Sequence, residues 1–191
     1  MILQEGWKGV DVSGWQRHRL PWTKLPLRFA VVKATEGERH RSEGWRLHAR
    51  DVKRAGMALG AYHFAHLDGD PVRQARLFVR VLRAGPWPDF AALDVEWSRR
   101  HDSKGPASKR VAWIKAWIAE VEGATKLPVA IYTQASYWRW KLGKADLSKW
   151  PLWQAGRWRI KGWPATMVQR KGRLPGVRGK IDINTVKRGW A

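Results

Sequence analysis

The chain has no cysteine, and that absence excludes several kinds of chemistry. Disulfides, thiolate metal sites and a cysteine nucleophile are all impossible for its 191 residues. No run of 18 apolar residues occurs, so no transmembrane helix is expected. The first residues lack the basic start and apolar core of a signal peptide. We therefore expect one domain over residues 1–191, with a core of its own.

Acidic residues are also scarce, whereas tryptophan is abundant. The 37 Lys and Arg outnumber 16 Asp and Glu, which gives a net charge of +21. Such a field favours a polyanionic partner: nucleic acid, an acidic polymer or an anionic membrane surface. The 15 Trp exceed what a core of this size requires. Their flat rings indicate stacking on sugars or on bases.

Strand-like and helix-like segments alternate through the first three-quarters of the chain. Alternation of this kind predicts parallel βαβ units. Five such units closed by three further strands predict an α/β fold, a modified TIM-like β/α barrel with active residues at the carboxyl ends of strands. The expected strands are residues 10–13, 29–34, 59–64, 90–96, 129–133, 152–154, 166–169 and 181–183, and the expected helices are residues 43–55, 70–84, 111–123 and 135–142.

The most informative strand ends in two acids, Asp94 and Glu96, separated by one residue. Alternate residues of a strand share a face, which places their Cα atoms roughly 6.6 Å apart. Desolvation and mutual repulsion oppose ionisation of both side chains. We expect one carboxylate and one group that keeps its proton near neutral pH, which is the division that glycoside hydrolysis requires.

Two more acids, Asp11 and Asp182, fall on other expected strands. A single acid on a strand is often structural, as an ion-pair partner or a cap. Four acids that converge at one end of a barrel are hard to explain structurally. We therefore take Asp11, Asp94, Glu96 and Asp182 as the candidate catalytic constellation.

An ordered set of motifs resembles glycoside hydrolase family 25, the Chalaropsis-type lysozymes or N-acetylmuramidases. The resemblance covers nearly the whole chain, and its specificity lies in the order of the motifs. They are GVDVSGWQ (9–16), FAVVKATEG (29–37), GAYHF (60–64), LDVE (93–96), IYT (131–133), LWQA (152–155) and PGVRGKIDIN (175–184).

The resemblance implies cleavage of the β-1,4 bond between N-acetylmuramic acid and N-acetylglucosamine in peptidoglycan, without a cofactor or a metal. It implies that Glu96 is the general acid/base. Asp94 would stabilise positive charge in the transition state or orient the substrate acetamido group. Asp11 and Asp182 match the family's other two acids at the floor of the site. The positions that line the sugar groove match Tyr62, Tyr132, Trp153 and Gln169.

The chain departs from the family pattern at two places where substrate would be gripped. Glu38-Arg39-His40-Arg41 stands where a Tyr and an Asp usually follow the second motif. Val168-Gln169-Arg170 stands where Trp-Gln-Tyr is frequent. These changes bear on subsite preference rather than on the reaction.

Charge and length together suggest a biological setting. No separate cell-wall-binding module is expected, and the basic surface could replace one by binding anionic wall polymers or outer-membrane lipids. We expect a monomeric bacteriophage endolysin, made in the host cytoplasm without a signal peptide and active on the cell wall or periplasm after release.

Two other functions stay open from the residues alone. A metal-dependent hydrolase could use His63 and His66 with Asp94 and Glu96, although residues three apart on a strand point to opposite faces. A nucleic-acid-binding protein is suggested by residues 153–163, which interleave aromatic and basic side chains. Acids in a groove would repel phosphate, so we do not expect specific nucleic acid as the main partner.

Overall fold

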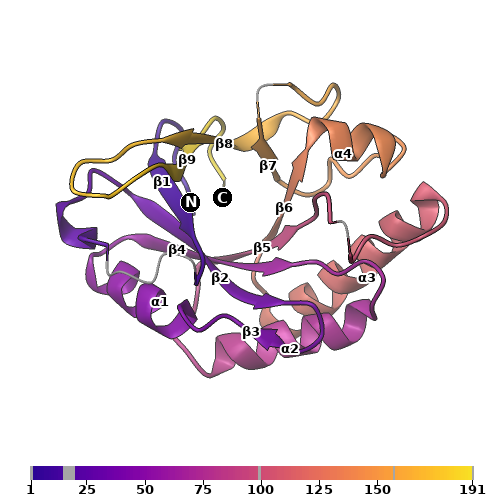
Figure 1. Ribbon diagram of the computed structural model, residues 1–191, viewed down its shortest axis with the longest axis horizontal. Coiled ribbons are helices and arrows are strands. Elements are labelled where there is room, and N and C mark those ends of the chain that lie inside the picture. Colours follow the sequence, from indigo (N-terminus) through magenta and orange to yellow (C-terminus); the bar gives the residue numbers. More distant parts are fainter. Residues whose placement is uncertain (1, 15–19, 99, 157, 191) are drawn as a thin grey trace.

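The computed structural model describes residues 2–14, 20–98, 100–156 and 158–190 and shows a closed barrel of eight strands (Figure 1). The expected β/α barrel is confirmed. Trp15 and Gln16 of the first motif lie outside the described residues. The barrel strands are β1 (Lys8–Val12), β2 (Phe29–Glu36), β4 (Ala58–Phe64), β5 (Phe90–Asp94), β6 (Val129–Gln134), β7 (Leu152–Ala155), β8 (Ala165–Gly172) and β9 (Ile181–Val186).

One strand runs against the others. β1, β2, β4, β5, β6, β7 and β8 pair in parallel, whereas β9 is antiparallel to both of its neighbours, β8 and β1, and closes the barrel. The β1–β9 register places Asp11 directly opposite Asp182. A short strand, β3 (His40–Arg41), pairs antiparallel with the end of β2 and is not part of the barrel.

Helices cover only part of the barrel (Figure 1). α1 (Trp45–Arg54), α2 (Pro71–Arg83) and α3 (Ala107–Thr125) lie together along one side, and the short α4 (Ala135–Trp140) follows β6. A 3-10 turn, η1 (Trp22–Lys24), lies between β1 and β2. No helix of the described residues is long and apolar enough to cross a membrane.

Local signals account for the start of α2 but not for the end of α3. Asp70 caps α2 as expected, because its Oδ1 accepts the Arg73 N–H at 2.9 Å. The prediction that α3 stops at Gly123 is wrong. The helix continues to Thr125 and ends at Lys126, which adopts a left-handed φ of 60°.

The strands separate two apolar cores by their alternation. On β5, Ala91 and Leu93 face the core between the barrel and its helices, whereas Phe90 and Ala92 face the barrel interior. The same period turns Asp94 inward. Gly60 of the neighbouring strand β4 leaves room for the Phe90 ring, because a Cβ on residue 60 would overlap that ring.

The prediction that Glu96 lies on the β5 strand is wrong. β5 ends at Asp94, which pairs with Phe64, the last residue of β4. Beyond that point β4 offers no further partner, and Glu96 lies in the loop toward α3. Val95 still donates its N–H to the Tyr132 carbonyl at 2.9 Å, so the chain leaves the barrel wall gradually.

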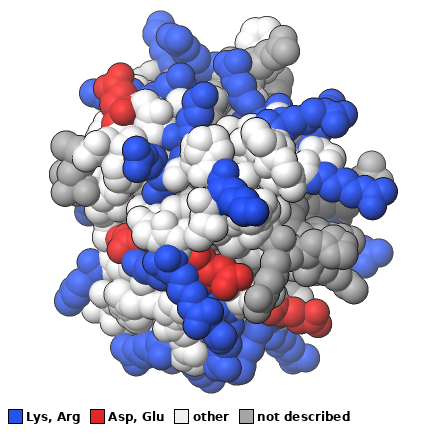
Figure 2. Space-filling model, turned by 90° about the vertical axis from the view of Figure 1, so that its left-hand side faces the viewer, with Lys and Arg blue, Asp and Glu red and all other residues white. Residues whose placement is uncertain are grey.

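Basic side chains are spread over the surface. Figure 2 shows Lys and Arg across the whole outline of one face, with few acidic side chains among them. On this face the basic side chains are therefore scattered rather than gathered in one block.

Candidate active site

Asp94 is a buried acid without hydrogen-bond compensation. It is 8% exposed at the carboxyl end of β5, and its Oδ1 has no hydrogen-bond partner among the described residues. Burial is the main cause, and the nearby Glu96 the second, of a pKa that lies well above the usual value for an aspartic acid. Asp94 therefore resists ionisation.

Glu96 is the more accessible member of the pair. Its side chain is half-buried, and its Oε2 accepts a hydrogen bond from Gln134 Nε2 at 3.1 Å. Burial raises the pKa of Glu96, while the Gln134 hydrogen bond and the positive charge of Lys33 oppose that rise. The two acids titrate as a coupled pair that retains a proton above the ordinary carboxyl range.

The loop that carries Glu96 is fixed by the next residue. Trp97 Nε1 donates to Ser136 Oγ at 3.3 Å, and the Trp97 ring meets the buried Tyr137 ring edge-on at 5.3 Å. Tyr137 in turn donates its hydroxyl to Asp102 Oδ1 at 3.1 Å. The first turn of α4 therefore sets the position of the loop beside the acid pair.

Asp11 receives the hydrogen bonds that Asp94 Oδ1 lacks. Its Oδ2 accepts from Gln169 Nε2 at 2.9 Å and from Asn184 Nδ2 at 2.8 Å. Burial nevertheless raises the pKa of Asp11 to about 7, and the charge of Asp182 adds to that rise. Asp182 is half-buried, and its Oδ1 lies 3.8 Å from Lys171 Nζ.

The predicted aromatic residues form a packed floor. The Tyr62 and Tyr132 rings meet the Trp153 ring edge-on, with centroids 6.2 and 4.8 Å away. Tyr132 donates its hydroxyl to Gln169 Oε1 at 2.9 Å, and Trp153 Nε1 donates to Asn184 Oδ1 at 2.7 Å. One hydrogen-bonded chain thus links Tyr132, Gln169, Asp11, Asn184 and Trp153, and the three rings are at most 9% exposed.

Three residues of this site were not predicted as functional. Asn184 and Gln134 hold Asp11 and Glu96 through their amides, and Lys33 lowers the pKa of both Asp94 and Glu96. The two-residue period of a strand contained a signal for the amides. Asn184 follows Asp182, and Gln134 follows Tyr132, by two residues, so each amide shares a strand face with a predicted site residue.

The histidines of the sequence analysis are engaged elsewhere. His63 is fully buried between Thr35 Oγ1 at 2.7 Å and Gln74 Oε1 at 2.9 Å, and burial lowers its pKa to about 3. His66 Nε2 lies 3.0 Å from Glu36 Oε1. Within the described part of the chain, the one group of ligand atoms spaced to hold a metal is His66, Asp68 and His101, which includes neither Asp94 nor Glu96.

Comparison with known proteins identifies the family of the chain. The sequence profile of glycosyl hydrolases family 25 matches residues 10–168. Lysozyme M1 of Streptomyces globisporus is 28% identical over 94% of this chain and 67% of its own. The crystal structure of a lysozyme from Streptomyces coelicolor superposes with a TM-score of 0.84 at 27% identity, covering 95% of this chain and 92% of that one. The catalytic domain of an endolysin from Listeria bacteriophage P40 gives 0.77 at 25% identity, covering 96% and 94%.

Proposed function

The chain belongs to glycosyl hydrolases family 25 and is a glycoside hydrolase of the lysozyme class, and from this premise we propose how it cleaves peptidoglycan. The bond cut is the β-1,4 bond between N-acetylmuramic acid and N-acetylglucosamine. Glu96 acts as general acid/base, and Asp94 as its electrostatic partner. The observation that carries this proposal is the placement of two acids: Asp94 is buried at the end of β5, and Glu96, two residues further along the chain, is half-exposed. Burial raises the pKa of both.

Glu96 suits proton transfer to the leaving oxygen. It is the acid of the pair that reaches solvent, and Gln134 binds only its Oε2, which leaves Oε1 for the glycosidic oxygen. Its raised pKa keeps a proton available closer to neutral pH than an ordinary Glu would. After departure of the first product, the same carboxylate accepts a proton from the attacking water.

Asp94 suits stabilisation of positive charge. A cationic ring or a cyclised acetamido group that develops beside Asp94 favours its ionised form, because the new charge offsets the desolvation that opposes ionisation in the free enzyme. The ionised carboxylate then stabilises the transition state more than it stabilises the ground state. Its Oδ1 is buried and has no hydrogen-bond partner among the described residues, which adds to the cost of ionisation in the free enzyme.

Asp11, Asp182 and the aromatic floor complete the proposal. The Asp11 carboxyl is oriented by two amides, and the Tyr132–Gln169 bond ties the floor to it. We assign Asp11 and Asp182 to the floor of the site. Tyr62, Tyr132, Trp153 and Gln169 shape the cavity beneath the sugar that is cleaved.

The test is the substitution Glu96→Gln, read by mass spectrometry of the products from purified peptidoglycan. The wild type should release fragments that end in reducible N-acetylmuramic acid. Glu96→Gln should lower turnover at least about 100-fold, because positioned acid catalysis contributes about 10²–10⁴-fold. Glu5→Gln, a change at an exposed glutamate, is the matched control and should leave turnover unaltered.

Each part of the proposal has an outcome that contradicts it. Full activity of the Glu96→Gln protein would remove Glu96 from the mechanism. Products that end in N-acetylglucosamine would keep a glycosidase but move the bond. Activity that disappears with a chelator and returns with zinc would favour the metal-dependent hydrolase.

The biological setting proposed for this activity is lysis of a bacterial host by a phage. The likeness to the endolysin domain of phage P40 and the basic surface support it. Released at lysis, a monomer would act on the wall from within. Expression of the chain together with a membrane-permeabilising protein should clear a bacterial culture, and Glu96→Gln should not; clearing by Glu96→Gln would contradict an enzymatic role in lysis.

A further inference from the structure

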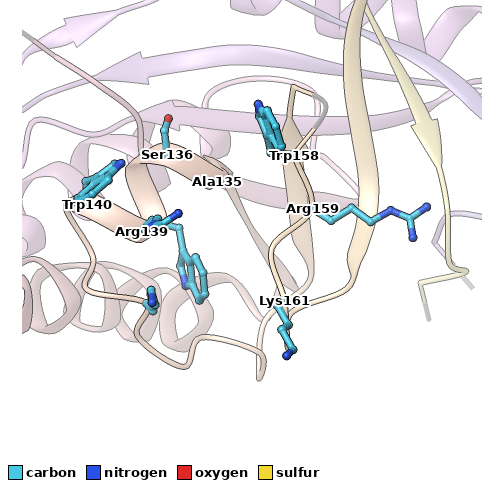
Figure 3. A pocket seen from close by; sticks show the side chains of 9 residues that line it. Ala135, Ser136, Arg139, Trp140, Trp158, Arg159 and Lys161 are labelled. Carbon is cyan, nitrogen blue, oxygen red and sulfur yellow. The ribbon is translucent and has the colours of Figure 1, made fainter.

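A cavity beside the acid pair has an unusual lining. It measures about 640 Å³ and lies between α4 and the loop that follows β7 (Figure 3). Trp140 and Trp158 are 70% and 83% exposed and stand on opposite sides of it. Its lining contains no acid among the described residues and consists of Ala135, Ser136, Trp138, Arg139, Trp140, Lys144, Trp158, Arg159 and Lys161.

The scaffold holds these rings in place. Buried Gln154 donates its Nε2 to the Trp158 carbonyl at 2.7 Å, and its Oε1 accepts the Ile160 N–H at 3.3 Å. The loop that displays Trp158 is therefore clamped to β7. On the other side, the Arg139 guanidinium lies over the Trp140 ring at 5.1 Å. Two large apolar rings held this far into solvent, at one cavity, indicate a binding surface rather than a core.

Positive charge continues past the loop into a second cavity of about 650 Å³. Both cavities share Arg159 and Lys161, and the second adds Arg170 and Lys187. In Figure 3 the Arg159 side chain points away from Trp140, to the far side of its loop. No acidic residue belongs to the described lining of either cavity. A band of at least six cations fits a polymer with repeated negative charges better than it fits a single anion.

The first cavity adjoins the catalytic pair through α4. Gln134, which binds Glu96, is followed in the chain by Ala135 and Ser136 of the lining. Ser136 also accepts the hydrogen bond of Trp97, the residue next to Glu96. A polymer bound at the cavity is thus held beside the acids that cut the wall.

We propose that Trp140, Trp158, Arg139, Arg159 and Lys161 bind a linear glycopolymer whose repeating units are joined by phosphodiesters and carry pyranose sugars. The sugar rings stack on the two indoles, and the phosphates pair with Arg139, Arg159 and Lys161. The choice of a glycan over nucleic acid rests on the proposed function, since the site adjoins acids that act on a sugar chain. The ligand differs from the peptidoglycan strand that is cleaved, and it anchors the enzyme to the envelope.

The probe is a soluble poly(ribitol phosphate) that carries N-acetylglucosamine, and binding is measured by calorimetry at about 0.15 M salt. The double substitution Trp140→Ala/Trp158→Ala should weaken binding at least about tenfold, because stacking contributes about 1–3 kcal/mol per ring and 1.4 kcal/mol is a factor of ten. Trp87→Ala removes a 43% exposed tryptophan that precedes β5, at the opposite end of that strand from Asp94, and should change nothing.

A second pair of variants tests the contribution of the basic side chains to binding. Arg159→Gln/Lys161→Gln should weaken binding and flatten its dependence on salt, because fewer counterions are released. Arg50→Gln/Arg80→Gln removes the same charge from exposed positions on α1 and α2 and should have a much smaller effect. Equal losses in the two pairs would reduce the site to unspecific surface charge and overturn the proposal.

Other probes decide the identity of the ligand. Equally tight binding of the ribitol phosphate polymer without sugar, or of neutral chitooligosaccharides, would overturn a site that needs both chemistries. Single-stranded DNA that binds as tightly, with the same loss in Trp140→Ala/Trp158→Ala, would make this a nucleic-acid site. Lipopolysaccharide vesicles that bind more tightly than the polymer would replace the polymer with a lipid surface. Binding is read without turnover, so the absence of muramidase activity would refute the proposed function and leave this test standing.

Discussion

The two halves of the barrel differ in what covers them, and the difference is chemical. β2, β4, β5 and β6 run beneath helices and are buried almost throughout, as expected for parallel strands covered on both faces. No helix of the described part of the chain covers β8 and β9, and many of their residues are half-buried or exposed. The covered half is apolar, whereas the bare half retains polar side chains along its strands.

This contrast explains why two acids of one site have different surroundings. Asp94 ends a covered strand, and its Oδ1 finds no donor among the described residues. Asp11 lies on β1, at the seam beside β9, where Gln169 and Asn184 of the bare half donate to it. Burial raises the pKa of both acids; at Asp11 amides of the bare half oppose that rise, whereas at Asp94 the charge of Lys33 opposes it.

The largest test of this contrast is Asp94→Asn. We expect turnover on peptidoglycan to fall by about two orders of magnitude or more, because a neutral amide cannot balance the positive charge of the transition state. The fold should be retained, since the substitution removes a group that is costly to ionise where it lies. Steady-state kinetics and chemical unfolding at pH 8 measure both. Unchanged activity would show that Asp94 is structural, and a large loss of stability would show that its carboxylate is compensated.

The covered half could be predicted closely from sequence. Its strands are largely apolar runs separated by helices, and one of these, α2, begins with a clear cap at Asp70-Pro71. The ends of elements were less predictable. Glu96 leaves the strand because β4 has already ended, and α3 passes Gly123 because a left-handed Lys126 can terminate it. The first depends on the pairing of β4 with β5, which local sequence does not contain, and the second on a left-handed conformation at a residue other than glycine.

The four acids of the site and one of their hydrogen-bond partners, Gln169, were predicted from sequence, but Gln134 and Asn184 were not. Asp11, Asp94, Glu96 and Asp182 stand out because acids are rare in this chain and these four lie on expected strands. Gln134 and Asn184 are ordinary amides in sequence. They become functional only when closure of the barrel brings β6 to the β5 loop and β9 to β1.

A smaller effect is expected for Gln134→Leu. The Gln134 amide favours the ionised form of Glu96, so its loss should raise the pKa of Glu96 and move the alkaline limb of the activity profile to higher pH. Turnover should fall about tenfold, since a hydrogen bond to a charged group is worth about 1.5–3 kcal/mol. The exposed Gln4→Leu is the control. An alkaline limb that stays in place would show that Gln134 does not tune Glu96.

The smallest of these effects is the pH-dependent change in folding stability that we expect for Asp11→Asn. In the folded protein Asp11 has a pKa of about 7, above the value of 3.8 for an ordinary aspartic acid. The folded state therefore binds more protons than the unfolded state between these values, and the Asp11 contribution to stability falls as pH rises through that window. His63, with a pKa lowered to about 3, acts in the opposite sense below its ordinary value of 6.5.

Comparison of Asp11→Asn with the wild type at each pH isolates the contribution of Asp11. Guanidinium unfolding at pH 5 and pH 8 should show that the substitution changes the free energy of unfolding more favourably at pH 8 than at pH 5. An equal change at both pH values would mean that the two amides already compensate the ionised carboxylate.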